Sequence, residues 1–136
     1  MSQENVEIVR RLVDAFNRDD VDTVLTAFEE GCEIDEPPQM PDSPVTGYRG
    51  HSGVREWMGN LRGVAGVTFE LRSATPSGDS LLCALASVGR GRGSDVPIEW
   101  TTFAVFGVRD GRIARVRVFL DHAEALEAAG LRSRRG

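Results

Sequence analysis

The sequence predicts an α+β fold, in which helices and strands occupy separate parts of the chain. In the first half, apolar residues recur mostly with the 3.6-residue period of helices, whereas after residue 66 they alternate with the two-residue period of strands. A further helical segment follows the last strand. Because the two kinds of element are segregated, a doubly wound parallel sheet is excluded. At 136 residues the chain is long enough for one ordinary core and too short for two.

Three helices are predicted in the first half. The first has an apolar stripe at helical spacing, made of Val6, Val9, Val13 and Phe16. It ends at residues 17–19, and Asp20 is of a type that caps the next helix, where Gly31 stands at an expected left-handed C-terminal cap. The third helix begins near His51, ends at Gly63 and carries Val54, Trp57, Met58 and Leu61 on one face. Between the second and third helices, residues 32–36 are predicted to be a short strand and the proline-rich residues 37–47 a surface loop.

Four antiparallel strands and one helix are predicted in the second half. The strands cover residues 67–72, 81–88, 97–106 and 113–120, with a hairpin tip at 89–93 and a tight turn at 109–111. Asp121 is predicted to cap the last helix, with Glu124 in a capping-box position, and Gly130 to close it. We therefore expect a single domain over residues 1–131 and a frayed tail at 132–136.

Composition excludes several classes of function. All 16 basic residues are arginine, so lysine Schiff bases and the phosphate-binding P-loop are excluded. Only two histidines and two cysteines are present, far apart, and we expect neither a metal site nor any other cofactor. A net charge of −5 argues against nucleic-acid binding, and no apolar run is long enough for a membrane span. These features, with two cysteines expected to be buried and reduced, predict a cytoplasmic protein.

Glu36 is the candidate catalytic residue. Strand alternation places it on the same face as Cys32 and Ile34, which are apolar and therefore expected to point inward. A carboxylate on such a face is costly unless it is paired or used, and desolvation would raise its pKa toward that of a general base. Alternatively, Glu36 emerges into solvent where the strand ends, or pairs with an arginine.

Other polar residues have both structural and functional interpretations. Glu99 stands at a strand start, and Asp121 and His122 have the positions of a helix cap and its neighbour, so a structural role with solvent exposure is favoured for all three. Whether any of them contributes to the pocket stays open on the sequence. His51 would either cap the third helix or donate to a ligand near Tyr48, the only tyrosine.

The last two strands have apolar residues on both faces. Thr101, Phe103 and Val105 are assigned to the inward face, together with Val116, Val118 and Leu120. The outer face then carries Trp100, Ala104, Phe106, Arg115 and Arg117. An outward apolar patch of this size predicts a homodimer through the sheet face, with the arginines as its polar part.

Five stretches of the sequence carry a family resemblance. They are VRRLVDAFN at 9–17, CEIDEP at 32–37, YRGHSGV at 48–54, and DGRI at 110–113 with EALEAAGL at 124–131. Together they resemble the SnoaL-like, ketosteroid isomerase-like branch of the nuclear transport factor 2-like superfamily over nearly the whole chain. The resemblance implies a cone: a curved, mainly antiparallel sheet wrapped around three N-terminal helices, with a short C-terminal helix and an apolar pocket inside. It also implies a dimer formed through the sheet.

The resemblance implies a catalytic position but not a complete isomerase. The isomerases of this superfamily carry their carboxylate in an acid-then-proline motif, which Glu36 and Pro37 match. Their tyrosine and acid donors would fall near Leu12 and Phe103, so both are missing and efficient steroid isomerisation is not expected. The Asp–Arg–Asp set of the related epoxide hydrolases is also not matched, because the inward face of the last strand is apolar.

Three functions remain open on the sequence. The first is proton abstraction beside a carbonyl, of isomerase or cyclase type, with Glu36 as base and a small apolar substrate. The second is a non-catalytic dimer that binds such a molecule, and the third is an interaction protein with a vestigial pocket. The predicted ligand-binding residues are Phe16, Phe28, Tyr48, His51, Trp57, Met58, Thr101, Phe103, Val118 and Leu120.

Overall fold

Helices and strands are arranged as the α+β prediction requires. The computed structural model describes residues 2–37, 47–62, 68–90 and 96–131. Along these residues the elements are α1 (Ser2–Asn17), α2 (Val21–Ala27), β1 (Phe28–Asp35), β2 (Gly47–Arg49), α3 (Gly50–Arg62), β3 (Thr68–Ser77), β4 (Ser80–Arg90), β5 (Pro97–Arg109), β6 (Arg112–Phe119) and α4 (His122–Ala128).

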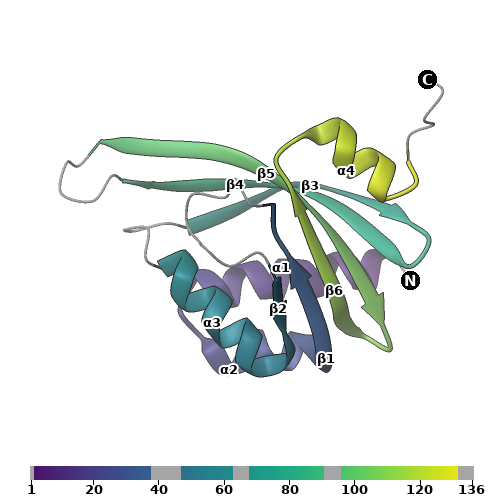
Figure 1. Cartoon of the computed structure of the whole chain (residues 1–136), viewed down its shortest axis with the longest axis horizontal. Helices are drawn as coiled ribbons and strands as arrows, with labels where there is room; N and C mark the ends of the chain where they lie inside the picture. The colour runs from purple at the N-terminus through teal and green to yellow at the C-terminus, as the bar shows by residue number, and fades with distance from the viewer. Residues whose placement is uncertain (1, 38–46, 63–67, 91–95, 132–136) are drawn as a thin grey trace.

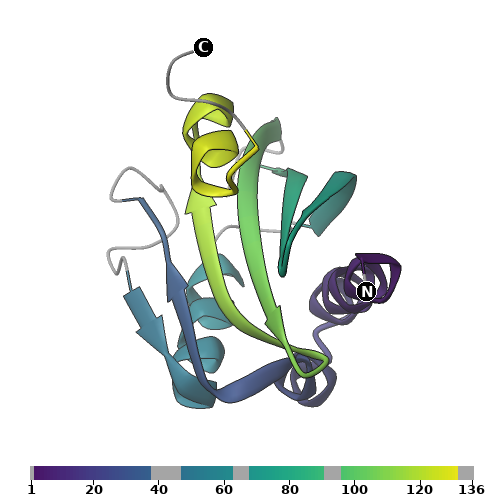
Figure 2. The ribbon, with the colours of Figure 1, turned by 90° about the vertical axis from the view of Figure 1, so that its right-hand side faces the viewer.

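The strands form one curved sheet in the order β2-β1-β6-β5-β4-β3. All neighbours are antiparallel except β1 and β6, which run parallel. The sheet curls around α1, α2 and α3, whereas α4 lies on its other side (Figures 1 and 2). We call the side facing α1–α3 the concave face and the side facing α4 the convex face. This arrangement confirms the predicted cone.

Each face of the sheet has its own apolar cluster. The main core fills the concave side, where buried residues of the helices such as Val9, Val24 and Val54 meet Ile34 and Phe106 of the sheet. A smaller cluster on the convex side joins Leu82 and Val105 to Ala125 of α4 and to Ala129, the residue that caps the end of α4. Membership of one cluster or the other therefore identifies the face to which a strand residue belongs.

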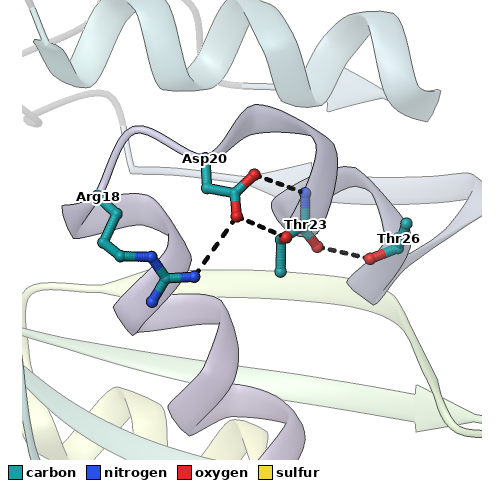
Figure 3. Close-up of polar contacts among 4 residues, drawn as sticks. All are labelled: Arg18, Asp20, Thr23 and Thr26. Atoms are coloured by element: carbon teal, nitrogen blue, oxygen red, sulfur yellow. Dashed lines mark hydrogen bonds and ion pairs between the residues drawn. The ribbon is translucent and has the colours of Figure 1, made fainter.

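The junction between α1 and α2 follows the predicted capping. Asp19, at φ 61°, turns the chain after α1. The Asp20 carboxylate then accepts hydrogen bonds from the Thr23 hydroxyl at 2.7 Å and the Thr23 backbone N–H at 3.2 Å (Figure 3). These two bonds are the main reason that the pKa of Asp20 is lowered. Because the cap fixes where α2 begins, it also fixes where β1 leaves α2.

Several boundaries differ from the predictions. Gly31 does not cap α2, because α2 ends at Ala27 and the chain is already extended at Phe28. A short strand, β2, follows the proline-rich segment and was not predicted. The predicted loop at 37–47, hairpin tip at 89–93 and tail at 132–136 fall wholly or largely outside the described residues.

The C-terminal end of the chain agrees with the predicted turn chemistry. Asp110 and Gly111 have positive φ angles of 54° and 77° in the β5–β6 turn. The Asp121 carboxylate caps α4 by accepting from the Ala123 N–H at 3.0 Å, and Gly130 ends the helix at φ 75°. None of the helices in the described ranges is long and apolar enough to cross a membrane.

The predicted faces of β5 were wrong. Ala104 and Phe106 lie in the main core, whereas Phe103 packs in the convex cluster and stacks on His122 at 4.7 Å. The cause is a β-bulge: Val108 pairs with Ile113, but Gly107 pairs with Arg115, so one extra residue stands in β6. An extra residue in one strand reverses the facing of the opposite strand relative to a regular ladder.

The bulge also removes the basis of the predicted dimer surface. Ala104 and Phe106 are buried within the chain, so they form no outward apolar patch. The arginine assignments were right: Arg115 bonds Asp35, and Arg117 donates to the Ala128 carbonyl oxygen of α4 at 3.1 Å. The convex face is therefore partly covered by the chain's own last helix.

Candidate functional site

Glu36 lies just beyond the end of β1 and is only 6% exposed. Cys32 and Ile34 are buried on the same face, as the alternation predicts. Glu33 and Asp35 point the other way and pair with Arg49 at 2.8 Å and Arg115 at 3.2 Å. The prediction that Glu36 faces inward is confirmed, and the alternative that it emerges into solvent is excluded.

Trp57 of α3 holds the Glu36 carboxylate. Its indole Nε1–H donates to Glu36 Oε2 at 2.9 Å. The same indole meets the Phe28 ring edge-on, with 6.4 Å between ring centroids. Phe28 is fully buried, so the indole is fixed on one side by a rigid aromatic contact. The orientation of the carboxylate is thus set by the packing of α3 on β1.

The residues at 48–54 explain why α3 comes so close to the sheet. Gly50 starts the helix at φ +68°, a conformation that favours glycine. A Cβ on Gly53 would stand 3.1 Å from Tyr48 atoms, so the helix approaches β2 more closely than a larger residue allows. Tyr48 is buried opposite Ile34, and its hydroxyl accepts from Asn60 of α3 at 2.9 Å. This part of the sequence therefore has a structural role in positioning Trp57.

His51 has a protein partner at the start of α3. Its Nε2 lies 3.0 Å from the Phe28 carbonyl oxygen, which makes that nitrogen the donor. Among the described residues, the imidazole is not seen to cap α3 or to contact Glu36. His51 therefore ties α3 to the first residue of β1.

The other predicted ligand-binding residues divide between the two faces. Phe16 and Met58 are buried in the main core, and Val118 packs against it, so all three share the concave side with Glu36. Leu120 follows β6 and is 41% exposed. Thr101 and Phe103 lie on the convex face because of the bulge in β6, away from Glu36. Glu99, Asp121 and His122 are exposed, as predicted.

Sequence reasoning missed two polar residues on the concave side and wrongly assigned a third, Trp100, to the outer face. Ser87 and Thr102 are buried, and Trp100 lies directly opposite Ser87 in the β4–β5 ladder. Ser87 continues the alternation of the core residues Leu81, Cys83 and Leu85, and that signal was available in the sequence. The concave position of Trp100 and Thr102 can be deduced from alternation on β5 only when the bulge in β6 is known.

The two thiols are chemically quiet. Burial raises the pKa of Cys83 to about 12 and also raises the pKa of Cys32. Thiols held in the neutral form are poor nucleophiles. Among the described residues, no group of three histidine, cysteine or acidic side chains is placed to hold a metal ion. Among the described residues, Glu36 is therefore the carboxylate buried on the concave side, which makes it the candidate base.

Comparisons with known proteins agree with this fold. A family model for the SnoaL-like domain matches residues 9–116. A nuclear transport factor 2-like protein of Burkholderia pseudomallei is 21% identical with a TM-score of 0.77, over 93% of this chain and 97% of that one. A protein of Catenulispora acidiphila with a ketosteroid isomerase-like fold, in complex with trimethylamine, is 16% identical with a TM-score of 0.71, over 93% and 94%.

A third solved structure is also similar. It is a protein of Sinorhizobium meliloti classed as a polyketide cyclase, 26% identical with a TM-score of 0.66, over 82% of this chain and 93% of that one. A search of curated proteins found no match to the chain.

Proposed function

The chain belongs to the family of SnoaL-like domains, and from that premise we propose that it binds a small, mainly apolar carbonyl compound on the concave face of its sheet, with Glu36 as general base. The observation that carries the proposal is the buried Glu36 carboxylate, held at 2.9 Å by the Trp57 indole among apolar residues. The likeness to a protein classed as a polyketide cyclase supports carbonyl chemistry.

The proposed reaction is removal of a proton from the carbon beside the carbonyl. The C–H electron pair moves into the C–C bond as the carbonyl π pair moves to oxygen, which gives an enolate and a protonated Glu36. Where a C=C bond is conjugated with the enolate, return of that proton to the far carbon of the dienolate completes an isomerisation. Attack of the enolate carbon on a second carbonyl of the same molecule would instead close a ring, and the resulting alkoxide would take the proton from Glu36. The Trp57 indole donates to one carboxylate oxygen and thereby holds the carboxylate in one orientation for this proton transfer.

A non-catalytic binding protein is the second candidate. Two groups near the site that could donate to an enolate already have partners, since His51 contacts the Phe28 carbonyl and Trp57 contacts Glu36. An enolate without donors is poorly stabilised, which favours slow turnover or binding alone. A homodimer through the part of the convex face that α4 leaves uncovered belongs to this candidate. Sedimentation at tens of micromolar tests it, and a monomer there would remove the dimer from the proposal.

Substitution of Glu36 by glutamine tests the function. Glutamine keeps the shape and the acceptor for Trp57 but cannot take a proton at neutral pH. On a panel of enones, polyketide-like carbonyls and steroids, we expect turnover to fall by about 10²–10⁴-fold while binding is kept. Glu33→Gln, on the opposite face of β1, is the matched control and should turn over normally. If wild type and Glu36→Gln bind equally and neither reacts, the binding protein stands; if neither binds any compound, both candidates fail.

A further inference from the structure

Two buried polar atoms on the concave face have no hydrogen-bond partner among the described residues. Within the described part of the chain, Ser87 Oγ and Trp100 Nε1 are buried and make no hydrogen bond. Ser87 is only 1% exposed. A buried donor without a partner costs free energy, so such groups are rare in native proteins and are kept where a ligand or water completes them.

The two atoms belong to one small area of the sheet. Ser87 and Trp100 are directly opposed in the β4–β5 ladder, where facing Cβ atoms lie about 5 Å apart. Each continues the core-facing alternation of its strand, through Leu85 on β4 and Ala104 on β5. Both groups therefore point into the same interior from neighbouring strands.

The surroundings of this pair are apolar. Ser87 is flanked on β3 by Phe69, whose ring meets Phe16 edge-on with 4.9 Å between centroids. The next residue of this face on β4 is Leu85, which packs against the main core. In such apolar surroundings a hydrogen bond from a hydroxyl or an indole N–H to an acceptor oxygen is stronger than the same bond in water.

We propose that Ser87 and Trp100 form a polar subsite in addition to Glu36. This subsite binds an acceptor oxygen at the end of the ligand that lies farther from Glu36. The indole N–H can only donate, and the hydroxyl can rotate to donate to the same atom, so a ketone or enol oxygen fits and a cation does not. That the other end of the ligand carries a carbonyl group beside Glu36 rests on the proposed function.

The register gives the length of molecule that would reach both ends. Asp35 of β1 pairs with Arg117 of β6, and Arg117 pairs with Val105 of β5. Glu36 is the next residue after Asp35, so it lies level with Ala104 of β5. Trp100 is then four residues along and two strands across, roughly 16 Å away between Cα positions at ~3.3 Å per residue and ~4.8 Å per strand. The ligand is therefore elongated, with a largely apolar body between two oxygen functions.

A matched pair of probes isolates the acceptor oxygen. The ketone 2-acetylnaphthalene and the hydrocarbon 2-isopropylnaphthalene have similar shapes, but only the ketone accepts a hydrogen bond. Calorimetric titration of the wild type should show the ketone binding about tenfold more tightly, as expected for one or two buried hydrogen bonds. In Ser87→Ala and in Trp100→Phe this preference should fall to about twofold or less. Ser73→Ala, an exposed serine on β3, should keep it.

Thermal unfolding without ligand provides a second readout. If the Ser87 hydroxyl is kept for a ligand, Ser87→Ala removes an unsatisfied group and the melting temperature should rise by a few degrees. A fall in melting temperature would mean that the hydroxyl is already satisfied within the protein, and would overturn the subsite. Equal binding of the two probes by the wild type, or binding of neither at millimolar concentration, would also overturn it. Neither result depends on turnover, so Glu36→Gln tests the proposed base separately.

Discussion

The bond between Trp57 and Glu36 makes a quantitative prediction about stability. Trp57→Phe keeps an aromatic ring against Phe28 but removes the N–H that donates to Glu36 Oε2 at 2.9 Å. Because the carboxylate is buried, the loss should lie in the range for hydrogen bonds to charged groups, about 1.5–3 kcal/mol. With a denaturant slope of about 2 kcal/mol per molar in urea, the unfolding midpoint should fall by about 1 M.

A double-mutant cycle separates this bond from ring packing. In a Glu36→Leu background the indole N–H has no carboxylate to meet, so adding Trp57→Phe should cost little. The coupling between the two positions should be at least about 1.5 kcal/mol, and the remaining Trp100 reports unfolding by fluorescence in every variant. An equal cost of Trp57→Phe in both backgrounds would refute the claim that the bond holds the carboxylate.

Three other predictions follow from the same structure. Phe106→Ala should lose about 3–5 kcal/mol of unfolding free energy because it empties the main core, and Phe103→Ala should lose less; the reverse order, measured in urea, would contradict the observed bulge. Cys83 should resist a disulfide reagent at pH 8 until the protein unfolds, and a rapid reaction in the native state would refute its burial. The buried neutral thiol should also contribute to the free energy of unfolding, fully below pH 9. This contribution should be lost as the pH rises toward the folded pKa of about 12. Gly50→Ala should cost about 1–2 kcal/mol because φ is +68° there, and an unchanged melting curve would argue against that turn.

The position of Glu36 could be predicted because β1 is regular where it matters. Between Cys32 and Glu36 the alternation is unbroken, and the two outward carboxylates have arginine partners on neighbouring strands. Pairing partners were not needed to assign this face, because one set of residues was clearly apolar. The general α+β order was predictable for the same reason, since the periods of the helices and strands are distinct.

The faces of β5 could not be predicted because both are apolar. One face carries Phe103 and Val105, and the other carries Ala104 and Phe106. The sequence contains no strong preference for which of the two faces lies toward the main core. An unbroken ladder from the Val108–Ile113 pair would place Val105 opposite Val116, consistent with the predicted assignment. The single extra residue in β6 reverses that choice, and alternation alone carries no signal for it. This one irregularity moved Thr101 and Phe103 out of the expected site and brought Trp100 and Thr102 into it.

The pairing of β1 with β6 determines when the Glu36 region can form during synthesis. Partners such as Asp35 and Arg117 are far apart along the chain, yet they lie side by side in the sheet. A ribosome must therefore translate β3, β4, β5 and β6 before β1 has its neighbour, and until then β1 has an unsatisfied edge. Contacts of such long sequence separation slow folding. The carboxylate of Glu36 is thus made early in translation, but the β6 side of its strand can pair only after residue 119 has been synthesised.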